Sequence, residues 1–266
     1  MQIHWFSPLP PIDVPAAACT AAVVPLLAQT ASVALWTTQE AWDPTVERAA
    51  RVQRYSLRGF PWREVNRGDW AIFHLGREAE HHGAIWRLFR LHSGIAVLHD
   101  VRIHELYLRA PRPVACEDPD FVDQCERIYG QAGRLAAEIY RGGLCSPERI
   151  AEAFPMLEPI LEAATGVLVH DGTLAQALAQ RAGPPVVLAP SPVGKDGDPG
   201  EYVRALYRLA AAADPGYTAS FRMAERIAQA MKPLAEVHVR EAVIDRAAKA
   251  ISSLMRRRPR DSEIKG

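Results

Sequence analysis

The sequence predicts an α/β fold: a Rossmann-like parallel sheet with helices on both faces, followed by an all-helical C-terminal extension. Short apolar segments that do not alternate with polar residues recur through the first two thirds of the chain, which is typical of strands buried on both faces. Segments with helical spacing lie between them, as in a parallel sheet. The strand pattern then stops, so we expect a Rossmann-like domain over residues 1–192 and a helical segment over residues 193–266.

Seven segments are predicted to be strands, and most of them are apolar runs next to turn residues. In chain order they are residues 2–6, 32–37, 51–55, 70–75, 95–99, 166–170 and 185–189. The carboxyl ends of parallel strands meet at one edge of a sheet, where ligands of such folds bind. The residues that follow each strand are therefore the candidates for chemistry.

Helices are predicted between these strands and after the last one. Their predicted positions are residues 16–29, 79–91, 119–141, 147 onward, 173–181 and 199 onward, with a longer periodic segment over 218–257. Asp118 and Ser146 each precede a proline, which is typical of a capping residue and the first helical position. Asp171 is expected to cap the helix after it, and residues 198–201 form a capping box.

Charge and cysteine content exclude several classes of protein. The chain has 31 basic and 31 acidic side chains, so no nucleic-acid-binding surface is predicted. The basic run at residues 256–260 is expected to be a solvated helix end, or at most a peripheral membrane or partner contact. Four cysteines without C-x-x-C spacing predict reduced thiols and a cytoplasmic location. Neither a signal peptide nor a run of the ~20 apolar residues that a membrane span needs is predicted.

Polar residues cluster near the predicted strand ends. They are Ser7, His74, Gly76, His81, His99, Asp100, His104 and His170. Because these strand ends converge, the groups are expected to share a cleft. Histidine exchanges protons near neutral pH, and Asp100 is expected to hold the orientation and tautomer of His99. Histidine, glycine and carboxylate groups also suit sugar hydroxyls, which need paired donors and acceptors.

These residues also allow other interpretations. A histidine after a strand is more often a satisfied loop residue than a catalyst, although three such strand ends favour a site. A zinc site of His81, His82, His99 and His104 is not expected, because adjacent histidines seldom ligate one ion and no H-E-x-x-H motif or cysteine pair supports it. No metal ligand is therefore predicted. The chain also lacks the G-x-S-x-G, G-x-G-x-x-G and P-loop motifs, which argues against the enzyme classes that use them.

Four segments resemble the N-terminal half of retaining glycosyltransferases with the GT-B fold. They are residues 3–11 (IHWFSPLPP), 74–76 (HLG) with 81–86 (HHGAIW), 97–102 (VLHDVR) and 166–170 (GVLVH). The resemblance covers about residues 1–192. It implies two facing Rossmann domains, of which the first binds the acceptor and the second binds a nucleotide sugar without a metal. No cofactor is expected apart from that donor substrate.

The resemblance also implies residue roles. It places His99 close to the reacting sugar, Ser7 near the donor phosphates, and His74 and Gly76 at the rim of the acceptor cleft. With the strand-end pattern, it makes His99 and Asp100 the catalytic candidates. The substrate-binding candidates are Ser7, His74, Gly76, His81, His104 and His170.

The chain departs from the family in three places. Residues 8–15 are rich in proline, where many members have glycines whose amides approach a diphosphate. Arg77 and Glu78 stand where the family often has two asparagines. Residues 190–266 lack the two glutamates, eight positions apart, that the donor-binding half should supply.

These patterns leave two expectations for function. In the first, the protein transfers a sugar from a nucleotide-sugar donor to a glycan or other acceptor. In the second, it is a degenerate, non-catalytic transferase that binds an acceptor, or that pairs with a full-length enzyme or a second copy through its C-terminal helices. A Rossmann-like module for another nucleotide is the third interpretation.

Overall fold

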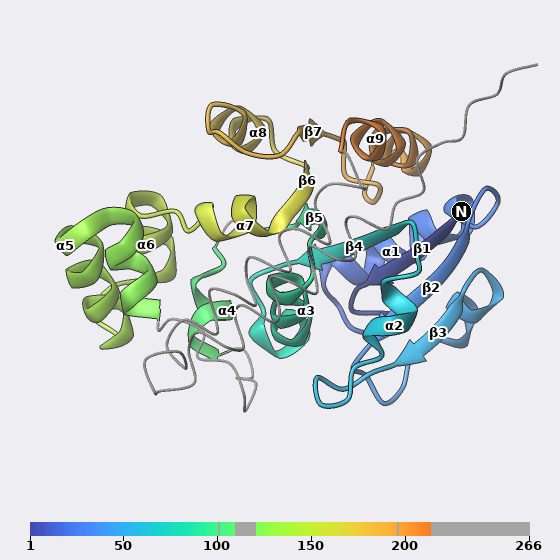
Figure 1. Cartoon of the computed structure of the whole chain (residues 1–266), viewed down its shortest axis with the longest axis horizontal. Coiled ribbons are helices and arrows are strands. Elements are labelled where there is room, and N and C mark those ends of the chain that lie inside the picture. Colours follow the sequence, from blue (N-terminus) through green and yellow to red (C-terminus); the bar gives the residue numbers. More distant parts are fainter. Residues whose placement is uncertain (101, 110–120, 196, 214–266) are drawn as a thin grey trace, which may run out of the picture. The chain divides into compact units, whose positions relative to one another are not determined.

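The computed structural model describes residues 1–100, 102–109, 121–195 and 197–213 and has one parallel sheet (Figure 1). The sheet has seven strands in the order β3-β2-β1-β4-β5-β6-β7, and all neighbouring strands are parallel. The chain moves outward from β1 in one direction and, after returning to β4, outward in the other. This is the Rossmann arrangement, so the predicted fold class is confirmed.

The strands are the seven predicted ones, with small differences at their ends. They are β1 (Gln2–Phe6), β2 (Ser32–Thr37), β3 (Arg51–Arg54), β4 (Trp70–Leu75), β5 (Gly94–Leu98), β6 (Ala164–Val169) and β7 (Val186–Leu188). The central strands are buried along nearly their whole length, as their apolar sequences predict.

Helices cover both faces of the sheet. They are α1 (Pro15–Leu27), the 3₁₀ helix η1 (Pro44–Arg48), α2 (Trp62–Val65), α3 (Ala79–Leu91), α4 (His104–Arg109), α5 (Phe121–Arg141), α6 (Pro147–Ala153), α7 (Glu158–Ala163), α8 (Gly172–Ala179) and α9 (Pro199–Ala212). One core cluster joins the sheet to α1, η1 and α9. The other joins its opposite face to helices that include α3, α4, α5 and α7.

The predicted N-cap residues are present wherever the structure describes them, although Glu201 of the predicted capping box accepts from Arg204 and Arg208. The side chains of Asp171, Ser146 and Asp198 each accept a hydrogen bond from a backbone amide in the first turn of α8, α6 and α9, respectively. The predicted start of α5 lies outside the described residues. Within α5, Gly130 has φ 64° and divides the element into two helical segments.

The sequence did not predict η1, α2, α4 or α7. Each of them has only four to six residues. A helix of one turn or slightly more gives too few apolar positions to establish a period of 3.6 residues. Such short helices depend on the tertiary packing around them.

The first helix after the sheet, α9, packs back on the sheet. Its side chains Tyr202, Leu206 and Leu209 are fully buried, as the apolar face predicted. A Cβ atom added at Gly166 of β6 would lie 2.8 Å from the Leu209 side chain, so the absence of a side chain there allows this close packing. The longer helical segment predicted over 218–257 lies outside the described residues.

We expect Gly166→Ala to destabilise the chain by about 1–3 kcal/mol, because the added methyl group would overpack the contact with Leu209. The matched control is Gly172→Ala, where the nearest atom to a new Cβ is 3.9 Å away. The control should change the free energy of unfolding by less than about 0.5 kcal/mol. Urea unfolding measures both variants, and equal effects would contradict the close packing of α9 on β6.

Four aromatic residues of the first strands form core, whereas Trp70 at the start of β4 is only half-buried. Trp5, Phe6, Trp36 and Phe73 are all buried, and the rings of Phe6 and Phe73 stack with centroids 4.6 Å apart.

Within the described part of the chain, no helix combines the length and apolar character that crossing a membrane requires.

Candidate functional site

The candidate site lies where the order of the strands reverses. Helix α1 follows β1 and covers one face of the sheet, whereas α3 follows β4 and belongs to the core on the other face. Since β1 and β4 are neighbours, their carboxyl ends border the crevice in which α/β sheets usually bind ligands.

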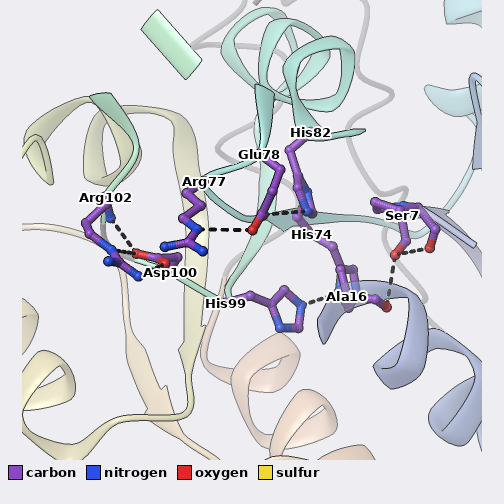
Figure 2. A network of polar contacts seen from close by, with 10 residues as sticks. Ser7, Ala16, His74, Arg77, Glu78, His82, His99, Asp100 and Arg102 are labelled. Carbon is purple, nitrogen blue, oxygen red and sulfur yellow. Dashed lines mark hydrogen bonds and ion pairs between the residues drawn. The ribbon is translucent and has the colours of Figure 1, made fainter. Parts of the chain in front are cut away.

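Three of the predicted histidines lie together, and we refer to His74, His99 and His170 as the histidine cluster. The Nδ1 atom of His74 and the Nε2 atom of His99 form a hydrogen bond of 2.8 Å (Figure 2). The His170 ring lies next to the His99 ring, with the two centroids 5.3 Å apart. The cluster therefore links the carboxyl ends of β4, β5 and β6.

Helices α1 and α9 contribute residues to the surroundings of this cluster. The Cys19 thiol from α1 and the two rings of His74 and His99 each bring one potential ligand atom, and these three atoms lie within 4.8 Å of one another. Tyr202 from α9 stacks on His170 with a centroid distance of 5.7 Å. Trp5 packs against His74 at 4.4 Å from the other side.

Burial sets the protonation of the cluster. It lowers the pKa of His74 and His99 well below 6.5, and the neighbouring histidines lower both further. Burial also lowers the pKa of His170, against the effect of its hydrogen bond to Ala189. The imidazoles are therefore neutral at pH 7. In His170 the Nδ1–H group donates to the Ala189 carbonyl over 3.1 Å. The Nε2 atom of the neutral ring therefore carries no proton and can accept a hydrogen bond.

The lowered pKa values of the cluster predict how the free energy of unfolding changes with pH. Above pH 6.5 both the folded and the unfolded chain hold these histidines neutral. Below it the unfolded chain binds more protons than the folded chain, whose pKa values are lowered. For the metal-free chain we expect the free energy of unfolding to fall between about pH 6.5 and pH 5.5. The slope is at most ~1.4 kcal/mol per pH unit for each histidine.

Urea unfolding in the presence of a chelator measures this slope. His74→Gln should flatten it, whereas His81→Gln, at a partly exposed position, should leave it unchanged. Stability that rises on acidification through this range would contradict the burial of neutral imidazoles.

Asp100 does not hold the ring of His99, contrary to the expectation from its position in the sequence. Its carboxylate accepts hydrogen bonds from Nε and Nη2 of Arg102 at 2.9 and 2.6 Å and from the Arg102 amide at 2.8 Å (Figure 2). The arginine holds the pKa of Asp100 below its usual value, although burial acts in the opposite direction. The His99 ring is hydrogen-bonded to His74 instead.

Ser7 and His81 line a separate hollow, which we call the rim pocket. Its volume is about 220 Å³. The lining residues come from the ends of β1 and β2 and the start of α3, and they are Ser7, Pro8, Ile12, Thr37, Thr38, Gln39, Glu80, His81 and Ile85. Hydroxyl, amide, carboxylate and imidazole groups thus face one space at the crevice where the strand order reverses.

Ser7 is already hydrogen-bonded within the protein. Its hydroxyl donates to the Pro8 carbonyl at 2.9 Å and accepts from the Thr20 hydroxyl at 2.8 Å. The loop after β1 also uses its amides internally: that of Leu9 donates to Gln39 at 2.6 Å and that of Ile12 donates to the Leu9 carbonyl. The prolines in this loop have no amide to donate.

Gly76 keeps the start of α3 close to the sheet. A Cβ atom at this position would lie 2.7 Å from Nε2 of His82. His82 is itself buried and donates from Nδ1 to the His74 carbonyl at 2.9 Å, so it supports the strand that carries His74 (Figure 2). Gly76 therefore has a packing role in the structure described here.

His104 lies away from the histidine cluster. It is buried in α4, where its Nε2–H group donates to the Phe154 carbonyl at 3.1 Å. Its ring packs against Phe121 and Tyr140, in the core on the α3 face of the sheet. His104 is thus a core residue, with Nε2 hydrogen-bonded and Nδ1 buried without a partner among the described residues, and it does not line a cleft with the other candidates.

Sequence reasoning missed Cys19, Thr37, Gln39 and Tyr202 as neighbours of the site. The signal for Thr37 and Gln39 was available, because Thr37 ends β2 and Gln39 lies two positions after it, at the carboxyl end of a predicted strand. Nothing in the sequence indicates which side of α1 or α9 faces the rim.

Comparisons of the chain with protein-family models, with curated proteins and with solved structures gave no match, so the fold and the site rest on the geometry described above.

Proposed function

We propose that this chain is a glycosyltransferase-like protein whose Rossmann-like domain binds a sugar or glycan acceptor in the rim pocket. The observation that carries the proposal is the composition of this pocket, where Thr38, Glu80 and His81 line about 220 Å³. Gln39 also lines it, but its amide is already engaged with Leu9, Thr37 and Ala41. A sugar needs paired donors and acceptors, which hydroxyl, carboxylate and imidazole groups provide. The volume is below the 300–1,000 Å³ of sites for drug-sized ligands and suits a single sugar unit.

The donor is held elsewhere in this proposal. The amides of Leu9, Ile12 and Val14 in the loop after β1 are used within the loop or by Gln39, and a buried amide that lacks a partner would be costly to create. This loop therefore does not offer a cradle for a diphosphate. Transfer requires a donor-binding domain from a partner subunit or from another part of the protein, and that domain must offset the charge on the leaving diphosphate.

The histidine cluster does not line the rim pocket, and in this proposal it contacts only an acceptor that extends beyond the pocket. His99 and His170 are the partly exposed members of the cluster, and the neutral ring of His99 can exchange a hydrogen bond with a sugar hydroxyl. Because three described cysteines are free thiols, a reducing compartment such as the cytoplasm suits the protein.

A second candidate function is non-catalytic acceptor binding as a partner subunit of a complete transferase. Two observations favour it: Asp100 is committed to Arg102, and the loop after β1 is closed by its own hydrogen bonds. A protein that only holds the acceptor needs neither an available carboxylate nor a phosphate-binding loop.

Isothermal titration calorimetry tests both candidates. The full chain is titrated with UDP-, GDP- and TDP-sugars and, separately, with free hexoses and short glycans. Saturable donor binding that His99→Ala abolishes would support a transferase. Acceptor binding alone, weakened about tenfold by His81→Ala through loss of one hydrogen bond, would support the partner subunit. Glu152→Ala on the exposed side of α6 is the control, and no binding of donor or acceptor would overturn both.

A further inference from the structure

Three metal-ligating side chains meet beside the histidine cluster. Cys19, His74 and His99 come from three different elements, and their ligand atoms lie within 4.8 Å of one another. A thiolate with two imidazoles is a donor set that favours zinc over magnesium or calcium. We propose that these three residues bind one Zn²⁺ ion and leave a fourth coordination position open beside His170.

The two histidine nitrogens need only small movements, whereas the Cys19 Sγ atom must move closer to them. The three atoms span up to 4.8 Å, and sulfur and nitrogen ligands on a tetrahedral zinc ion lie about 3.6 Å apart. On a tetrahedral zinc ion with Zn–N bonds of 2.0–2.1 Å, two nitrogens lie about 3.3 Å apart. His74 Nδ1 and His99 Nε2 lie 2.8 Å apart, so these two atoms already face each other at nearly the required spacing. The ion takes the place of the proton that the two rings share, and that proton moves to the other nitrogen of its ring.

The surroundings hold the ligands in place. His74 is fully buried in β4 between Trp5 and the His99 ring, and Cys19 is buried in α1. A ligand that is fixed by its backbone and by packing loses little conformational entropy when it binds a metal. This arrangement differs from a chance group of surface side chains.

Buried polar groups without partners point to a missing ligand. Around the cluster, among the residues that the structure describes, the Tyr202 hydroxyl and the Nε2 atoms of His170 and His74 are buried and have no hydrogen-bond partner. The Tyr202 hydroxyl lies beside the Cys19 thiol and would donate to a zinc-bound thiolate. The Nε2 lone pair of His170 would accept from a water molecule in the fourth position, since its Nδ1–H group is held by Ala189.

The protons and charges balance. Zn²⁺ and the neutral Cys19 thiol form a zinc thiolate and release one proton, while both histidines stay neutral. The site then carries one net positive charge. A three-ligand zinc site with an open position can bind water or an anion.

Cobalt substitution tests the proposal on the full chain. The chelator-treated protein is titrated with Co²⁺ and then with Zn²⁺. We expect one Co²⁺ per chain, with a near-ultraviolet thiolate-to-cobalt band and visible bands of tetrahedral cobalt, both removed by one equivalent of Zn²⁺. Cys19→Ser should abolish the thiolate band and weaken binding about 100-fold or more. Cys125→Ser, which removes a buried thiol from the opposite core, should keep both.

A second measurement on the wild-type chain does not depend on whether the variants fold. Calorimetric titration of Zn²⁺ in buffers of different protonation enthalpy should show release of one proton per ion. The absence of a thiolate band in the wild-type chain would overturn the proposal, and so would its persistence in Cys19→Ser. Neither test uses a sugar, so the outcome is independent of the function proposed above.

Discussion

Trp5→Ala is expected to destabilise the chain by about 3–5 kcal/mol, a large part of the stability of an ordinary domain. The indole is fully buried in β1, and its Nε1–H group donates to the Thr20 hydroxyl at 2.9 Å. Its ring also supports His74 at a centroid distance of 4.4 Å. The substitution removes apolar contacts, leaves a cavity under α1 and deprives Thr20 of a donor. Urea unfolding followed by far-ultraviolet circular dichroism measures the loss.

Two further variants separate the contributions of this indole. Trp5→Phe keeps an aromatic ring against His74 and removes the hydrogen bond, so a loss of about 1–2 kcal/mol is expected. Trp42→Ala removes a partly exposed indole that donates to Glu47 at 2.8 Å, and it should cost less than about 1 kcal/mol. Equal losses for Trp5→Ala and Trp42→Ala would contradict a structural role for Trp5 beneath the rim.

The parallel sheet could be predicted because its strands carry their signal locally. A strand such as β5, GIAVL, is buried on both faces and reads as a continuous apolar run. The caps of α6, α8 and α9 were equally local, since a capping residue and the amide it accepts from are two or three positions apart. The helices of four to six residues, such as α2, have no comparable signal, because packing with distant residues stabilises them.

The site could be predicted only in part. Parallel strands bring their carboxyl ends together, so the meeting of His74, His99 and His170 followed from three strand ends. Asp100 was expected beside His99 because the two are adjacent in sequence. Adjacent residues in extended chain point in opposite directions, and Asp100 instead reaches Arg102, two positions on. The contribution of Cys19 depends on how α1 rotates against the sheet, which a single sequence does not reveal.

Tyr202 is expected to give two opposite results according to the substitution. Tyr202→Ala should destabilise the chain by about 3–5 kcal/mol, because it removes a fully buried ring that joins α9 to the sheet and stacks on His170. Tyr202→Phe should be neutral or stabilising in the metal-free chain. The hydroxyl is buried, and its polar neighbour among the described residues is the Cys19 thiol, a weak acceptor that does not form a well-aligned hydrogen bond with it, so its removal relieves a desolvation cost. Urea unfolding in the presence of a chelator measures both variants.

The pair of substitutions at Tyr202 also connects stability with the site. If the Tyr202 side chain contributes only packing, phenylalanine can replace it both with and without metal. If the hydroxyl donates to a metal-bound Cys19 thiolate, Tyr202→Phe is harmless without metal, and it weakens Zn²⁺ binding about 10–100-fold, as the loss of an outer hydrogen bond to a ligand does. A loss of metal-free stability in Tyr202→Phe as large as that in Tyr202→Ala would contradict both interpretations, since it would mean that the hydroxyl has a partner inside the folded chain.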